Sequence, residues 1–230
     1  MDFSITVFRA IRITDNLNLY ITETLVITWI IIAAFIALAI VVKVKSKKWK
    51  ALEKPTGLQN VMEFLVASFE NIFKNSAGDK IIYLAPWYFS LFAFLIVSNI
   101  IGITGFRPPT ADWSMTFPLA LSSLFLIQYA GIRHRPWNYI KSFFQPVFIF
   151  FPLNIMGELS KPIAMSFRLF GNILGGMILM SLLYGLAPFI LTLGIPAVLH
   201  AYFDVAVGVL QAFIFLVLSI TFAGLAAEDS

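Results

Sequence analysis

Long apolar stretches alternate along the chain with short clusters of basic residues. Residues 25–42 carry no charge. As a helix they would extend about 27 Å, close to the ~30 Å hydrocarbon core of a bilayer. Residues 81–103 and 114–132 are similarly long, apolar and uncharged. The pattern therefore predicts three conventional transmembrane helices.

The basic clusters predict how these spans are oriented. Five lysines lie within residues 43–50, directly after the first span, and residues 133–135 are Arg-His-Arg, directly after the third. Basic residues flanking membrane spans concentrate on the cytoplasmic side. We therefore expect both clusters in the cytoplasm, the N-terminus and residues 104–113 outside, and the C-terminus in the cytoplasm.

Residues 57–75 have a different pattern, that of an amphipathic helix. One stripe is apolar and the opposite face is polar. The stripe consists of Leu58, Val61, Leu65, Phe69 and Ile72, and the polar face of Asn60, Glu63, Glu70 and Lys74. This pattern predicts a helix lying along the cytoplasmic membrane surface. The alternative is a helix packed on a partner subunit.

The last third of the chain holds two apolar stretches, 146–186 and 189–227, that are too long for upright spans. A helix of about 40 residues measures roughly 60 Å, twice the hydrocarbon thickness. Fitting that length requires a tilt of roughly 60°, far above the ordinary ~20°. The prolines at 152 and 162 could instead break the first stretch. We favour a hairpin of two steeply tilted helices, and the fold class expected for residues 1–230 is a single all-α polytopic membrane domain.

Composition supports a membrane protein and excludes several kinds of chemistry. The chain is 60% apolar and 12% charged, about half the charged fraction of soluble domains. It has no cysteine and two widely separated histidines, which argues against thiol chemistry and a histidine metal site. No phosphate-binding loop, serine elbow or zinc-ligand spacing is present. We expect no enzyme activity of its own, no cofactor and no nucleic-acid partner.

Arg168 is the only formally charged residue between Lys161 and Asp204. A charge at membrane depth costs roughly 2.5–3.5 kcal/mol on insertion scales, so such residues are usually functional. No acid lies within one helical turn of Arg168 in the sequence. Its partner must be distant in this chain or belong to another chain.

Arg168 lies in a polar stripe on the first long helix. Lys161 precedes it by seven residues and Asn172 follows it by four, which places all three on one helical face. Glu158 and Ser160 lie to one side, nearer the cytoplasmic end. Polar stripes at this depth normally face the bundle interior or a water-filled cavity.

The second long helix carries its own polar stripe, formed by His200, Asp204, Gly208 and Gln211 at steps of four, four and three residues. The amides of Asn172 and Gln211 could line an ion path, or they could hold the two helices together by hydrogen bonding. His200 could simply be interfacial. An acid eight residues after Pro196 is expected below the outer surface, so Asp204 is a stronger candidate.

The glycines at 171, 175 and 176 also have two interpretations. Small residues allow close helix packing, and they also give clearance to a helix that moves past the surface. In both cases we expect backbone to pass close to a neighbouring helix at these positions.

Several segments together resemble subunit a of the F-type ATP synthase, with similarity in order along essentially the whole chain. The most specific is the Arg-Leu-Phe-Gly-Asn element. The matching segments are Asn154-Ile-Met-Gly-Glu158-Leu-Ser-Lys161-Pro162, Phe167-Arg168-Leu-Phe-Gly171-Asn172, Gln211-Ala-Phe-Ile-Phe215, Ser98-Asn99 and the loop Gly-Phe-Arg-Pro-Pro-Thr-Ala-Asp.

The resemblance implies a membrane stator beside a rotating c-ring, held by subunit b and the peripheral stalk in the bacterial inner membrane. Two offset half-channels would carry protons, or sodium ions, to and from the c-subunit carboxylates. The family's essential arginine falls on Arg168, and the partner it lacks would be the c-subunit acid.

The family's other ion-path positions can also be carried over. The outer amides fall on Asn172 and Gln211, and an acidic or histidine position falls on Asp204. Met177 stands where many bacterial members have glutamate, so Asp204 is expected to lack its usual ionisable neighbour. At the inner half-channel, Asn154 replaces an acid of some members, and Glu158 could substitute for it.

A stand-alone ion-coupled secondary transporter, with Arg168 binding an anionic substrate, is the alternative function. The sequence shows no internal repeat, although repeats are common in transporter folds. The ion carried is decided mainly by the c subunit, so this sequence leaves protons and sodium ions both open.

Overall fold

A computed structural model describes residues 7–14, 17–47, 49, 57–186 and 195–228. In chain order its principal elements are β1 (Val7–Thr14), β2 (Leu17–Thr22), α1 (Glu23–Ser46), α2 (Leu58–Ala77), α3 (Ala85–Ile100), α4 (Trp113–His134), α5 (Pro136–Ser142), α6 (Phe151–Leu186), α8 (Ile195–His200), the π-helical segment η5 (Ala201–Val207) and α9 (Gly208–Ala227). Short 3₁₀ turns are η1 (Ile82–Leu84), η2 (Ile101–Thr104), η3 (Pro109–Ala111) and η4 (Phe148–Phe150).

The described structure is mostly helical, as expected for an all-α polytopic membrane protein, and a β-hairpin that was not expected precedes the first span. β1 and β2 pair antiparallel, with Arg9 opposite Ile21 and Ile11 opposite Leu19. These strands are rich in isoleucine, threonine and other residues that favour extended backbone. This composition could have predicted the two strands. The hairpin was overlooked because the long apolar span that follows is a much stronger pattern.

Five helical stretches of the described chain are long and apolar enough to cross a membrane: Glu23–Ser46, Ile82–Thr104, Trp113–His134, Phe148–Gly185 and Val198–Ala227. The first is the least buried inside the protein. Its exposed side chains are large and apolar, among them Trp29, Ile30 and Ile36. Such a surface suits contact with lipid or with another membrane helix.

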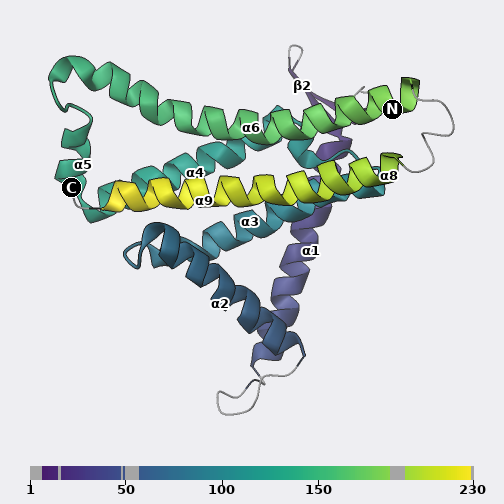
Figure 1. Cartoon of the computed structure of the whole chain (residues 1–230), viewed down its shortest axis with the longest axis horizontal. Coiled ribbons are helices and arrows are strands. Elements are labelled where there is room, and N and C mark those ends of the chain that lie inside the picture. Colours follow the sequence, from purple (N-terminus) through teal and green to yellow (C-terminus); the bar gives the residue numbers. More distant parts are fainter. Residues whose placement is uncertain (1–6, 15–16, 48, 50–56, 187–194, 229–230) are drawn as a thin grey trace.

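The helices form a bundle in which α4 packs against both α6 and α9, and α3 packs against α9. Figure 1 shows α6 and α9 running side by side across the molecule, while α1 crosses their direction steeply. The core between them contains Tyr88, Leu95, Ile127, Phe215 and Ile220, all buried. At the N-terminal end of α1, Thr24 Oγ1 donates to Asp112 Oδ2 at 2.7 Å.

α6 is one continuous helix, so the prolines do not break it. It has 36 residues with Pro162 inside, which corresponds to about 54 Å of helix. A helix of this length exceeds the ~30 Å hydrocarbon core and must tilt to cross it. The degree of tilt, and the division into three conventional and two tilted spans, stay proposals.

The second long helix is not uniformly α-helical. α8, η5 and α9 follow one another without interruption, and η5 is a seven-residue π-helical segment that contains Asp204. π-helical segments such as η5 are rare and occur often at functional sites. The expected hairpin connection between the two long helices falls on residues 187–194, outside the described residues.

The two halves of the amphipathic helix α2 differ in burial. Its C-terminal half buries Phe69 and Phe73 in the core of the bundle. Its N-terminal half leaves Val61, Phe64 and Leu65 exposed. The described structure therefore accounts for one half of the apolar stripe, and the membrane-surface location stays a proposal for the other half.

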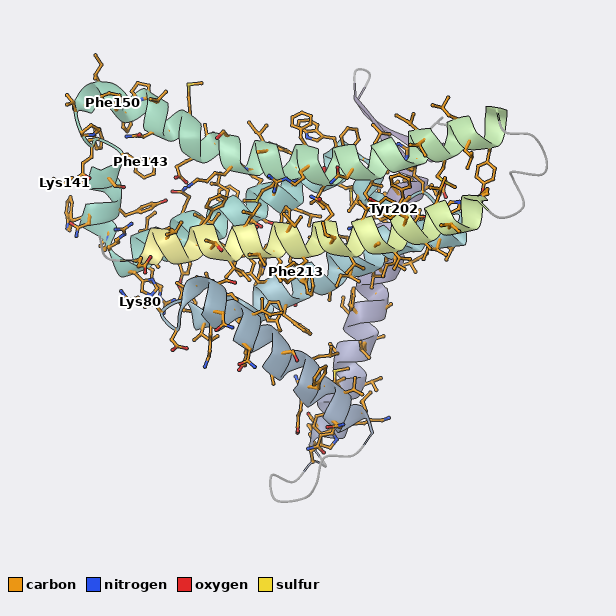
Figure 2. The ribbon with its side chains drawn as sticks, in the orientation of Figure 1. Lys80, Lys141, Phe143, Phe150, Tyr202 and Phe213 are labelled. Carbon is orange, nitrogen blue, oxygen red and sulfur yellow. The ribbon has the colours of Figure 1, made fainter. Side chains whose placement is uncertain are left out.

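The two ends of the bundle are distinct. Figure 2 shows Lys141, Phe143 and Phe150 at the end where the chain passes from α5 into α6, and Tyr202 towards the opposite end. At the first end Arg135 Nε donates to the carbonyl of Ala226 at 3.0 Å. This contact satisfies a terminal carbonyl of α9 that has no partner within the helix.

Candidate functional site

The candidate residues fall into three groups along the α6–α9 pair. Glu158 and Lys161 form an α5-end cluster, together with side chains from α4 and α5. Asn172 and Gln211 join the two helices near the middle of the pair, with Arg168 one turn before Asn172. His200 and Asp204 form an α8-end cluster on α8 and η5.

The two central amides bond directly to each other. Asn172 Nδ2 donates to Gln211 Oε1 at 2.7 Å, so the interhelical bond considered from the sequence is present. Gln211 is 1% exposed, and its Nε2 has no hydrogen-bond partner among the described residues. An unpartnered buried donor is costly and favours an oxygen acceptor beside it.

Arg168 lies on an exposed face of α6. Within the described residues it takes part in no salt bridge and no side-chain hydrogen bond. The same face exposes the small residues Ala164, Gly171 and Gly175. A positive charge flanked by small residues leaves room for another helix to approach the backbone of α6.

The three glycines at 171, 175 and 176 differ in whether a neighbouring helix lies close to them. A Cβ on Gly176 would lie 3.3 Å from Phe203, so α6 and η5 approach closely there. Gly171 and Gly175 would meet nothing within 4 Å. No helix of the described residues approaches these two glycines, so the expectation of a close neighbouring helix stays a prediction for them.

The α8-end cluster is a chain of three polar side chains. His200 Nδ1 and Asp204 Oδ2 are 2.6 Å apart, and Tyr184 Oη lies 3.3 Å from His200 Nε2. The Asp204 side chain is 18% exposed. Asp204 therefore has an ionisable neighbour in His200, while Met177 stands at the position where many bacterial relatives carry glutamate.

Asp204 faces the loop end of α3. A Cβ on Gly102 would lie 3.2 Å from its carboxyl carbon. One turn away Asn99 Nδ2 donates to the carbonyl of Gly208 at 2.7 Å, and Thr110 Oγ1 donates to Asn99 Oδ1 at 2.7 Å. These contacts fix α3 and η3 against the point where η5 becomes α9.

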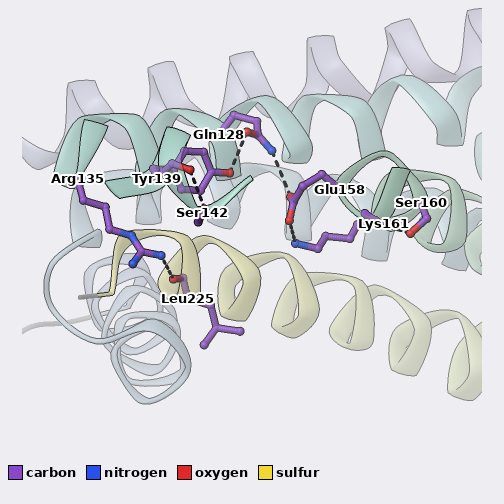
Figure 3. A network of polar contacts seen from close by, with 9 residues as sticks. Gln128, Arg135, Tyr139, Ser142, Glu158, Ser160, Lys161 and Leu225 are labelled. Carbon is purple, nitrogen blue, oxygen red and sulfur yellow. Dashed lines mark hydrogen bonds and ion pairs between the residues drawn. The ribbon is translucent and has the colours of Figure 1, made fainter. Parts of the chain in front are cut away.

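The α5-end cluster is a network of polar contacts (Figure 3). Glu158 Oε1 pairs with Lys161 Nζ, and Gln128 Nε2 donates to Glu158 Oε2 at 3.2 Å. Tyr139 Oη donates to Gln128 Oε1 at 2.8 Å. Lys161 Nζ also lies 4.9 Å from the ring centre of Phe222 on α9, a cation–π arrangement.

Two other residues named from the sequence make local contacts. Ser160 Oγ donates to the carbonyl of Gly157 at 2.7 Å. Asn154 Nδ2 donates to the carbonyls of Phe143 and Gln145 at 2.8 and 3.0 Å. Asn154 thus ties the start of α6 to the loop after α5, and Glu158 is the carboxylate of this end.

Sequence reasoning missed Asn99, Gln128, Tyr139 and Tyr184 as members of these clusters. Asn99 and Gln128 lie inside predicted spans, and an amide at membrane depth is itself a signal of function. Tyr139 and Tyr184 carried no such signal, because a tyrosine near a span end is usually an interfacial anchor.

Five membrane-length helices of the described chain, with polar clusters at both ends of the α6–α9 pair, define a polytopic membrane protein. Residues 25–224 match the family of the ATP synthase A chain. The chain belongs to this family, whose activity is ATP synthesis coupled to ion transport in a membrane.

Individual relatives cover nearly the whole chain. The ATP synthase subunit a of Geobacter sulfurreducens is 34% identical over 213 residues, which are 90% of this chain and 89% of the relative. The subunit a of Moorella thermoacetica is 35% identical over 204 residues, 88% of this chain and 89% of the relative.

Proposed function

We propose that the chain is the stator subunit a of an F-type ATP synthase membrane sector. In this role it provides two offset half-channels that carry protons, or sodium ions, to and from the carboxylates of a rotating c-ring. The observation that carries the proposal is Arg168. It is exposed, has no ion-pair partner within the described residues, and lies between two polar clusters.

Electrostatics explains what Arg168 would do there. A guanidinium stays protonated at any physiological pH. A nearby positive charge favours the ionised form of a carboxylate, so a c subunit arriving at Arg168 would release its cation. The same fixed charge repels cations and would prevent direct leakage between the half-channels.

The two end clusters supply a polar route on each side of Arg168. His200 and Asp204, followed by the Asn172–Gln211 pair, suit the outer half-channel. Glu158 and Lys161 at the α5 end suit the inner half-channel. Arg133 in the last turn of α4 and Arg135 directly after it favour the cytoplasm at the α5 end.

This orientation places the N-terminus outside and the C-terminus in the cytoplasm of a bacterial inner membrane. The subunit itself would be non-catalytic, and its partners would be the c-ring, subunit b of the peripheral stalk and membrane lipid. The long tilted helices α6 and α9 would lie against the ring, with the small residues around Arg168 on the contact face.

Purification in mild detergent tests the assignment. An affinity-tagged chain expressed in its native host is expected to copurify with a ring of c subunits and a peripheral stalk. A secondary transporter that uses Arg168 as an anion site would purify alone or as a homo-oligomer. Recovery without any rotor or stalk subunit would therefore overturn the stator assignment.

A further inference from the structure

Two side chains of the α5-end cluster, Gln128 and Tyr139, are not part of the ion path carried over from the family. They form a hydrogen-bonded chain from α5 through α4 to α6 (Figure 3). Tyr139 donates to Oε1 of Gln128, and Nε2 of the same amide donates to Glu158. With Lys161 on the other oxygen, both carboxylate oxygens of Glu158 are held.

Tyr139 is itself rigidly placed. It is 6% exposed, and its ring lies so close to Gly131 that a Cβ there would be 2.6 Å from Cε2. The ring also packs edge-to-face on Phe143, with centres 5.3 Å apart. Burial of the phenol is the main cause and the negative charge of Glu158 the second cause that raise the pKa of Tyr139 to about 12. The phenol is therefore a hydrogen-bond donor at physiological pH.

A fixed phenol donor decides which way the Gln128 amide points. An amide has a donor end and an acceptor end, and the Tyr139 hydroxyl engages the acceptor oxygen. The amide nitrogen is then turned towards Glu158. A reversed amide would place its oxygen against the carboxylate, which is repulsive when that carboxylate is ionised.

We propose that Tyr139 is a positioning residue for Glu158: through Gln128 it fixes the geometry in which this carboxylate exchanges cations at the inner half-channel. The inference rests on the proposed function, because it assumes that Glu158 lies on the ion path. Among the described residues, Lys161 on α6 pairs with Glu158, and Tyr139 on α5 lies in the electrostatic field of both Glu158 and Arg135.

The test is Tyr139→Phe, which removes the hydroxyl and keeps the ring. ATP-driven pumping is measured in inverted membrane vesicles that contain the assembled complex, over a series of pH values on the cytoplasmic face. Without the hydroxyl the Gln128 amide can reverse and turn its oxygen towards Glu158. The acid limb of the pumping profile should therefore move to higher pH, and the rate on that limb should fall roughly threefold or more.

Tyr129→Phe is the matched control, since it deletes a tyrosine hydroxyl of α4 that accepts from Arg133 and lies outside the network. Its pH profile should equal that of the wild type. Gln128→Leu should reproduce the shift of Tyr139→Phe. Adding Tyr139→Phe to Gln128→Leu should cause no further change, because Tyr139 acts through the amide.

Two outcomes overturn the inference. One is a wild-type pH profile for Tyr139→Phe in a fully assembled complex. The other is a double variant in which the two effects add. Arg168→Ala tests the proposed function independently of Tyr139. If Arg168→Ala loses coupling while Tyr139→Phe behaves like the wild type, the stator assignment stands and only the Tyr139 inference fails.

Discussion

Asn172 Nδ2 on α6 donates a hydrogen bond to Gln211 Oε1 on α9 at 2.7 Å, one helical turn beyond the exposed Arg168. Since Oε1 of Gln211 is engaged, the atom left without a partner among the described residues is its buried Nε2. An unsatisfied buried donor costs about 1–3 kcal/mol. A hydrated path beside this amide would recover that cost, which fits an ion route close to Arg168.

Replacement of Arg168 tests the centre of the proposed mechanism. Arg168→Ala should abolish ATP-driven ion pumping and ion-driven synthesis, and passive cation leak should rise because the positive barrier is gone. Arg168→Lys should not restore full function, since an ammonium cannot present the planar guanidinium fork. Both activities are measured in membrane vesicles. Coupled ATP synthesis at the wild-type rate in Arg168→Gln would contradict the assignment of the chain as a stator.

Replacement of Asp204 tests the α8-end cluster. Asp204→Asn nearly preserves volume and hydrogen bonding, so the complex should assemble. Ion translocation should nevertheless slow about a hundredfold or more, the scale at which a positioned proton-transfer group contributes. His200→Gln should weaken transport less, because the carboxylate remains. An assembled Asp204→Asn complex with unchanged rate and pH dependence would contradict this role.

Substitutions at the adjacent glycines Gly175 and Gly176 should cause two different defects. Gly176→Leu should destabilise the subunit itself, because its side chain would collide with Phe203 at the contact between α6 and η5. A side chain at Gly175 would meet no described residue of this chain, so Gly175→Leu should leave the subunit folded and impair association with the ring. Yield of the isolated subunit and recovery of the ring with it distinguish the two. Equal loss of subunit yield would refute the distinction.

Periodicity and length carried much of the fold prediction. The lengths of residues 146–186 and 189–227 led to the expectation of unbroken long helices, and α6 is continuous through Pro162. The β-hairpin was missed because its strands are short and precede a much stronger apolar signal. The π-helical turn around Asp204 could not be predicted, because its side-chain pattern resembles that of an ordinary helix.

The candidate site was less predictable than the fold, because its geometry depends on contacts between distant segments. The Asn172–Gln211 bond joins residues 39 positions apart, and the Gln128–Glu158 bond joins residues 30 apart. Helical spacing placed Lys161 on the face of Arg168, whereas the structure pairs it with Glu158. Local periodicity gives the face of a helix but not the neighbour that covers it.

Gly131 should tolerate no side chain. The Cβ of Gly131→Ala would overlap the buried ring of Tyr139, and overpacking of this kind costs about 1–3 kcal/mol. We expect a lower thermal stability of the detergent-solubilised complex and a pH profile shifted like that of Tyr139→Phe. Gly157→Ala is the matched control, because its Cβ meets nothing within 4 Å. Equal stability of both variants would contradict the prediction.

The hydrogen bonds of Asn99 with Thr110 and Gly208 should contribute to the stability of the subunit as a pair. Asn99→Leu removes the acceptor of the buried Thr110 hydroxyl and the donor to the Gly208 carbonyl. Leaving a buried group unsatisfied costs about 1–3 kcal/mol, whereas replacing both partners with apolar groups is nearly neutral. Asn99→Leu should therefore lower the temperature at which the subunit dissociates from the purified complex, and adding Thr110→Val should recover part of the loss. Additive destabilisation by the two changes would show that the hydroxyl and the amide do not act as a pair.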